Sequence, residues 1–72
     1  FNLYPNPANN LINLSGDIEE INRIEIYDLT GKLVQTYPKN YSIDVTFLNH
    51  GIYLMRIVDK NGINYNRKFI KN

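Results

Sequence analysis

Apolar and polar residues alternate in several short runs of this chain, and this alternation constrains the fold more than any other feature. The runs occupy residues 22–29 (NRIEIYDL), 41–46 (YSIDVT) and 64–70 (NYNRKFI). A period of two is typical of a strand that turns one face to the core and the other to water, as in antiparallel sheets. The residues predicted to face the core in these runs are Ile24, Ile26, Tyr41, Ile43, Val45, Tyr65, Arg67 and Phe69.

Three further runs complete the predicted strands. Residues 51–58 (GIYLMRIV) are apolar on both faces except at Arg56, which predicts a central strand, and Leu11–Leu14 and Lys32–Tyr37 are the others. Only residues 16–22 have helical character, and they are too few for a stable helix, so we expect a loop or a single turn there. About seven short strands separated by tight turns predict an all-β sandwich or barrel.

Two turns share one pattern, DLTG at Asp28–Gly31 and DKNG at Asp59–Gly62. In each turn the aspartate is suited to accept hydrogen bonds from the turn backbone, and the glycine supplies a positive φ. Because Asn61 and Gly62 both tolerate the left-handed conformation, a primed turn is predicted at this pair. Each of the two turns is expected to close a β-hairpin.

Tyr53 favours the sandwich over the barrel. It follows Gly51 in the run LNHGIY, at the start of the predicted central strand. This arrangement resembles the tyrosine corner of immunoglobulin-like folds, in which the hydroxyl donates to the backbone a few residues upstream. The competing interpretation is that Tyr53 only packs in the core. The predicted architecture is an immunoglobulin-like antiparallel β-sandwich.

The segment YPNP, residues 4–7, is predicted to lie at the edge of a sheet. Proline lacks an amide donor and has a fixed φ, so it occurs at strand ends and edges, and Pro7 favours an extended conformation for Asn6. We therefore expect the first short strand to end at Leu3–Tyr4 and the segment to cover an exposed edge.

The composition excludes several classes of protein. The chain has 72 residues, no cysteine and one histidine, so we expect a single domain without disulfides, and His50 has no partner with which to hold a metal. No serine has a plausible base and no phosphate-binding loop is present, so neither catalytic residues nor a cofactor are predicted. The net charge of +1 argues against nucleic acid as a partner. No apolar run approaches the ~20 residues of a membrane span, so direct membrane insertion is not expected.

The charges are divided unevenly along the chain. Residues 1–50 carry three basic and six acidic side chains, a net −3, whereas residues 51–72 carry five basic and one acidic, a net +4. Late strands that pair with early ones would balance these charges. Alternatively, Arg67, Lys68 and Lys71 form a basic strip for an acidic receptor. The tyrosines leave a similar choice, between core packing and a stacking platform for sugars.

The chain resembles the type A C-terminal sorting domain of the Bacteroidota type IX (Por) secretion system. Four pieces carry the resemblance in this order: YPNPANNLINL, IEIYDLTGKLVQ, YSIDVTFLNHGIYLMRI and a terminal KFIKN. It covers essentially all of residues 1–72 and implies an immunoglobulin-like β-sandwich, cut from the end of a longer secreted protein. It also implies that the domain directs the upstream cargo protein from the periplasm through an outer-membrane translocon to the cell surface or medium. A shuttle protein and a sortase-like protease that removes the domain are the other implied partners.

By this resemblance, a set of motif positions is expected to serve recognition by the translocon, while unpaired strand edges offer docking by β-augmentation. A carbohydrate-binding or adhesive β-sandwich is the alternative, and it predicts an exposed row of tyrosines. A structural spacer would leave the location of the cargo unchanged when removed. The motif positions are Pro5, Asn6, Pro7, Asp28, Gly31, Gly51, Tyr53, Lys68, Phe69, Ile70 and Lys71.

Overall fold

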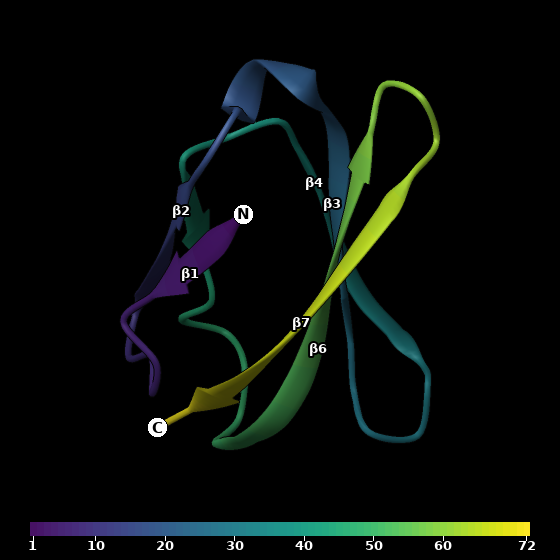
Figure 1. The fold of residues 1–72 in the computed structure, drawn as a ribbon. Coiled ribbons are helices and arrows are strands. Elements are labelled where there is room, and N and C mark those ends of the chain that lie inside the picture. The colour runs from purple at the N-terminus through teal and green to yellow at the C-terminus, as the bar shows by residue number, and fades with distance from the viewer.

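The protein, described by a computed structural model over all of residues 1–72, is a small sandwich of two antiparallel sheets (Figure 1). One sheet has three strands in the order β1-β2-β5, and the other has four in the order β4-β3-β6-β7. The predicted all-β sandwich and the single turn before β3 are both confirmed. The elements are β1 (Asn2–Tyr4), β2 (Leu11–Ser15), the 3-10 turn η1 (Ile18–Glu20), β3 (Ile21–Tyr27), β4 (Leu33–Pro38), β5 (Ser42–Asp44), β6 (Gly51–Asp59) and β7 (Asn64–Lys71).

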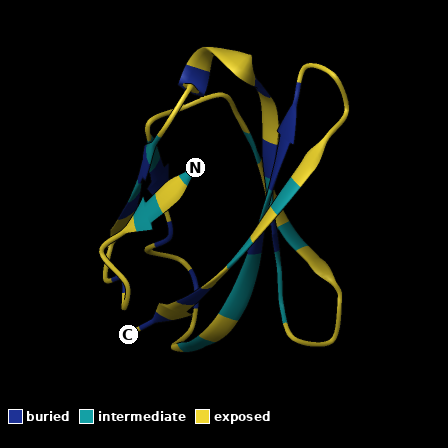
Figure 2. Ribbon diagram, viewed as in Figure 1, coloured by how far each residue is buried: buried dark blue, intermediate teal, exposed yellow.

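The alternation in the sequence places most side chains as predicted. Ile24 and Ile26 of β3 are fully buried, and Phe69 of β7 is fully buried between two exposed neighbours. Figure 2 shows how buried, intermediate and exposed stretches are distributed along the strands. β6 lies between β3 and β7, which confirms the central strand. The structure contains no helix of the length and apolarity that crossing a membrane requires.

The core lies between the two sheets and is built mainly from isoleucine. Each fully buried side chain of this size contributes about 1.5–3 kcal/mol relative to an exposed one, so the buried cluster is a main source of stability in this chain without cysteine. The buried cluster consists of Ala8, Ile12, Leu14, Ile18, Ile21, Ile24, Ile26, Ile43, Val45, Leu48, Met55, Ile57 and Phe69.

The prediction that Tyr41 faces the core is wrong, because its side chain is 62% exposed. The period of two holds for Ile43 and Val45, which are fully buried. β5 begins only at Ser42, where it pairs with Asn13 of β2. Tyr41 lies before the strand and is joined to β2 only through its carbonyl, which accepts from the Leu14 amide at 2.7 Å, so its side chain lies at the end of the sheet and is exposed.

The two DxxG turns close hairpins with the same hydrogen bonds. Asp28 Oδ1 accepts from the Thr30 and Lys32 amides at 2.9 and 3.1 Å, between β3 and β4. Asp59 Oδ1 accepts from the amides two and four residues later, each at 2.9 Å, between β6 and β7. Gly31 and Gly62 have φ values of +87° and +82°. The predicted role of the aspartate and the glycine is thus confirmed in both turns.

One detail of the second turn differs from the prediction. No residue other than glycine has a positive φ, so Asn61 does not adopt the left-handed conformation of a primed turn. Instead the Gly62 amide donates to the Asp59 carbonyl at 3.0 Å, and Gly62 alone supplies the positive φ. The hydrogen bonds to the Asp59 side chain stabilise this longer loop, which resembles the hairpin loops that end in a glycine bulge.

Candidate recognition surfaces

The N-terminal segment is hydrogen-bonded to the end of the last strand. Asn6 Oδ1 accepts from the Ile70 amide at 3.0 Å, the Ala8 amide donates to the Ile70 carbonyl at 2.7 Å, and the Asn72 amide donates to the Ala8 carbonyl at 2.8 Å. We call Asn6, Ala8, Ile70 and Asn72 the terminal seam. Figure 1 shows the end of β7 reaching the loop after β1. The predicted covering of a sheet edge is confirmed, and the edge is that of β7.

The sequence of the segment explains how it covers this edge. Pro5 and Pro7 have no amide hydrogen, so the donors and acceptors for β7 come from the Asn6 side chain and the Ala8 backbone. Ala8 is fully buried, and its small side chain lets the segment lie close to the core. A parallel bridge between Ala8 and Lys71 joins the segment to β7.

The first residue extends these contacts along β7. Arg67 Nε donates to the Phe1 carbonyl at 3.0 Å, and the Phe1 ring packs edge-on against Tyr65 with centroids 5.2 Å apart. Along β7, the backbone N–H and C=O groups point towards β6 and away from it at alternate residues. Those of Lys68 therefore point away from β6, like those of Ile70, but no residue of the N-terminal segment pairs with them. The edge of β7 is therefore closed at its end and open at Lys68.

The four motif positions of β7 have different surroundings. Phe69 is fully buried, and Ile70 is 44% exposed. Lys68 is exposed, whereas Lys71 is only 8% exposed and its Nζ donates to the Asn72 carbonyl at 3.3 Å. The interpretation of a basic strip for a receptor thus fits Lys68 better than Lys71.

The tyrosine corner is present. Tyr53 Oη donates to the Asn49 carbonyl at 2.8 Å, which confirms the predicted bond to the backbone upstream. The Tyr53 ring also stacks on Phe69 with centroids 5.6 Å apart. Gly51 begins β6, and a Cβ there would lie 3.9 Å from the Tyr53 ring. These contacts tie the start of β6 to the terminal strand.

A groove lies on the outer face of the four-stranded sheet, at the end where the first DxxG turn projects. It measures about 350 Å³, and we call it the outer-face groove. Leu54 of β6 stands opposite Tyr27 of β3 and Lys68 of β7, so the groove crosses three strands. Its lining residues are Tyr27, Asp28, Leu29, Gly31, Tyr53, Leu54, Arg56 and Lys68.

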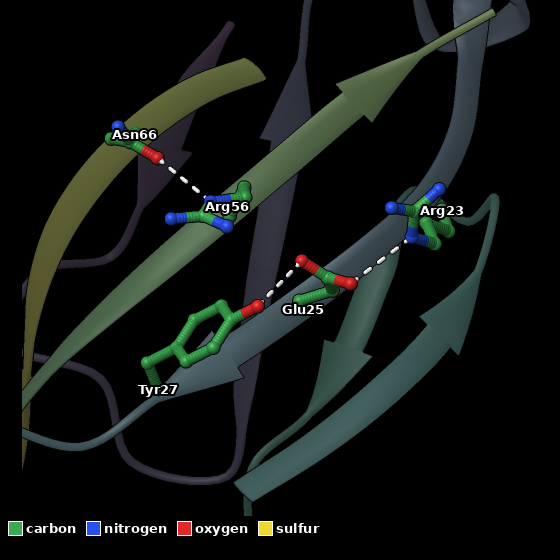
Figure 3. Close-up of polar contacts among 5 residues, drawn as sticks. All are labelled: Arg23, Glu25, Tyr27, Arg56 and Asn66. Carbon is green, nitrogen blue, oxygen red and sulfur yellow. Dashed lines mark hydrogen bonds and ion pairs between the residues drawn. The ribbon is translucent and has the colours of Figure 1, made fainter. Parts of the chain in front are cut away.

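A polar network borders the groove (Figure 3). Glu25 accepts from Arg23 Nε at 3.0 Å and from Tyr27 Oη at 2.9 Å. Burial raises the pKa of the Glu25 carboxyl, but these hydrogen bonds outweigh it and hold the pKa below its usual value. The Arg56 guanidinium lies 4.9 Å above the Tyr27 ring, and its Nε donates to Asn66 Oδ1 at 3.5 Å. Both carboxylate oxygens of Glu25 therefore have hydrogen-bond donors without an ion pair to Arg56.

Direct pairing does not balance the charges of the two halves. The ion pairs of the structure are Arg23–Glu25 and Lys39–Glu19, and both lie within residues 1–50. Arg56 stands opposite Glu25 in the sheet, which places one late cation near an early anion, but it forms no salt bridge. The cations of β6 and β7 thus have no carboxylate partner, and among them Lys68 is exposed.

The tyrosines do not form an exposed row. Tyr37, Tyr53 and Tyr65 pack against the core, and Tyr27 lies under Arg56. Tyr41 is exposed. The platform predicted for the carbohydrate-binding alternative is therefore absent. His50 is exposed in the loop before β6, and no group of three or more side chains is arranged to hold a metal ion.

Sequence reasoning found the motif residues but missed both surfaces that they form. The seam joins residues 64 positions apart, such as Asn6 and Ile70, and no local pattern reveals this. The groove left a signal, because residues 51–58 are apolar on both faces and one of these faces had to lie outside the core. Leu54 on that face lines the groove.

A family model described as "Secretion system C-terminal sorting domain" matches residues 2–72. No similar protein was found among curated proteins. The matched range includes all of the terminal seam and all of the outer-face groove.

Proposed function

Because the chain belongs to the secretion system C-terminal sorting domain family, we propose that it carries a cargo protein from the periplasm through the type IX translocon of the outer membrane. The family itself supports the broader function, a type IX sorting signal that directs export through the envelope towards the cell surface or medium. Catalysis is not a known activity of such signals, and the proposal assigns none.

The terminal seam is the observation that best supports this function. Asn6 and Ala8 hold the end of β7 through three hydrogen bonds, so the first and last motifs form one folded unit. A translocon component that binds this unit would recognise a folded surface and not a linear peptide. The seam explains why motifs at both ends of the chain belong to one signal.

The motif residues take two roles in this proposal. Pro5, Asn6, Pro7, Phe69 and Lys71 shape the seam and the core beneath it, so they serve recognition by holding the surface in place. The remaining motif positions lie at the groove and at the tyrosine corner, and the translocon would contact those that are exposed. Asp28, Gly31 and Lys68 line the groove, Ile70 lies beside it, and Gly51 and Tyr53 belong to the corner.

We further propose that a shuttle protein receives the domain and that a sortase-like protease then removes it. β1 pairs with β2 from Asn2 to Tyr4, and Phe1 is held by Arg67 and Tyr65. A protease needs an accessible, extended substrate, so these contacts favour a cut on the cargo side of β1.

The test is export of a fluorescent reporter in a bacterium with a type IX system. The reporter, targeted to the periplasm, carries residues 1–72 at its C-terminus, or the same domain without residues 68–72. We expect the intact domain to take the reporter across the outer membrane only when the translocon works, and the shortened domain to fail. A folded intact domain that leaves the reporter in the periplasm would contradict the proposal and favour a binding module.

A further inference from the structure

The outer-face groove combines apolar surface with exposure to water. Leu29 at its rim is 72% exposed, and Leu54 lies half-buried on its floor. The apolar surface continues along the sheet to Ile52 and Ile70, which stand opposite each other and are 41% and 44% exposed. Contiguous apolar surface on a small domain marks a place where another molecule binds.

The groove is lined by two cationic side chains and one carboxylate. Asp28, its acidic residue, accepts hydrogen bonds through Oδ1 from the Thr30 hydroxyl and two turn amides. These bonds bind the carboxylate into its own turn. Arg56 and Lys68 line the groove and form no salt bridge with any carboxylate. The groove therefore offers two cations beside an apolar floor.

The position of Arg56 is fixed before any partner arrives. Its guanidinium carbon lies 4.9 Å from the centroid of the Tyr27 ring, and Asn66 Oδ1 accepts from its Nε at 3.5 Å. A guanidinium held in this way leaves its terminal nitrogens free to donate to a carboxylate, and less side-chain entropy is lost on binding. Across the groove, Lys68 has open backbone groups at the edge of β7, where an extended segment can add hydrogen bonds.

We propose that the outer-face groove binds an extended segment of the type IX export machinery that carries a carboxylate between apolar side chains. The inference rests on the proposed export function. The carboxylate is placed between Arg56 and Lys68, and the flanking apolar side chains cover Leu29 and Leu54. The charge of the groove selects an acidic partner over a basic one, because like charges across an interface are strongly disfavoured.

The first test reverses one charge in the exported reporter fusion. Lys68→Glu should lower the exported fraction at least about tenfold, because it sets a like charge against the partner's carboxylate. The matched control is Lys60→Glu, an equally large change of net charge at an exposed site outside the groove, and it should export like the parent. Lys68→Arg keeps the charge and should also export.

The outcomes separate this inference from the export function itself. If the parent is exported and Lys68→Glu is exported as well as Lys60→Glu, the inference that the outer-face groove binds an acidic segment is wrong. A parent that is not exported would overturn the proposed function instead. Protease resistance in the periplasm shows whether Lys68→Glu folds, and if it does not, the second test decides.

The second test places a photoreactive amino acid at Leu29 or, as a control, at Ile63. Both side chains are apolar and exposed, but only Leu29 lines the groove. We expect Leu29 to crosslink, during export, to a peptide of a type IX component that contains Asp or Glu, and Ile63 not to. Equal crosslinking from both sites, no crosslink from Leu29, or a crosslink only to a second copy of this domain would each overturn the inference.

Discussion

The terminal seam and the outer-face groove both contain motif residues, but those residues have different surroundings. In the seam, the Asn6 side chain bonds to the Ile70 backbone, and the neighbouring Phe69 and Lys71 are buried. In the groove, Lys68 is exposed and has no ionic partner. The difference indicates that substitutions in the terminal seam affect export by lowering the stability of the domain, whereas substitutions in the outer-face groove affect export by weakening recognition.

The largest expected effect tests the core beneath the seam. Phe69→Ala removes a fully buried ring that stacks on Tyr53 and should cost about 3–5 kcal/mol of unfolding free energy. A chain of this length has a total of about 4–11 kcal/mol, so the variant should lose a large share of its stability and unfold at a clearly lower urea concentration. Urea denaturation followed by circular dichroism measures this. The matched control is the neighbouring Ile70→Ala, and equal losses from the two variants would contradict the account of the seam.

A smaller effect is expected at the tyrosine corner, which links β6 to the seam. Tyr53→Phe removes the bond from Oη to the Asn49 carbonyl but keeps the ring on Phe69, and should cost about 1 kcal/mol. Tyr41→Phe, at an exposed tyrosine, should leave the melting temperature unchanged. If the two variants melt together, the corner bond contributes nothing to stability.

The seam itself is tested by one side chain. Asn6→Ala removes the acceptor of the Ile70 amide and should cost about 1 kcal/mol, which corresponds to roughly fivefold faster hydrogen exchange at that amide. Asn9→Ala removes an exposed side-chain bond to Asn72 and should leave Ile70 protected. Unchanged exchange at Ile70 in Asn6→Ala would show that the segment does not hold β7.

The last effect is confined to alkaline pH and concerns the opposite side of the sandwich, where Tyr37 Oη donates to the Asp44 carbonyl at 2.8 Å. Burial, with a contribution from the Asp44 charge, raises the pKa of Tyr37 from 10.0 to about 12. The folded state thus favours the neutral phenol, so its contribution to stability is complete below pH ~10 and is lost as the pH rises towards about 12. Tyr37→Phe should flatten this part of the melting profile, and Tyr41→Phe should not. Identical profiles for the two variants would remove Tyr37 as the cause.

The sequence predicted what depends on local pattern. The period of two located β3 and β7 and the burial of Ile24, Ile26 and Phe69, and the two DxxG turns were correct in their aspartate and glycine roles. Tyr41 was placed wrongly because the start of β5 is set by pairing with β2, which a single run does not reveal.

The candidate sites were less predictable for a physical reason. The motif residues could be named from their resemblance to a family, but their grouping depends on contacts between distant strands. Asn6 meets Ile70 only after the whole sandwich has formed, and Lys68 meets Tyr27 across β6 through the sheet register. The burial of Lys71 follows from the bridge with Ala8 and has no signature in the terminal run KFIKN.

The measurement that tests the central claim most directly compares export with folding in one series of variants. The exported fraction of the reporter is measured for the parent, Asn6→Ala, Tyr53→Phe and Phe69→Ala, beside the folded fraction of each at the same temperature. If the signal is a folded surface, export should fall in step with the folded fraction and be lowest in Phe69→Ala. Full export of an unfolded Phe69→Ala domain would contradict this and show that the machinery reads a linear sequence.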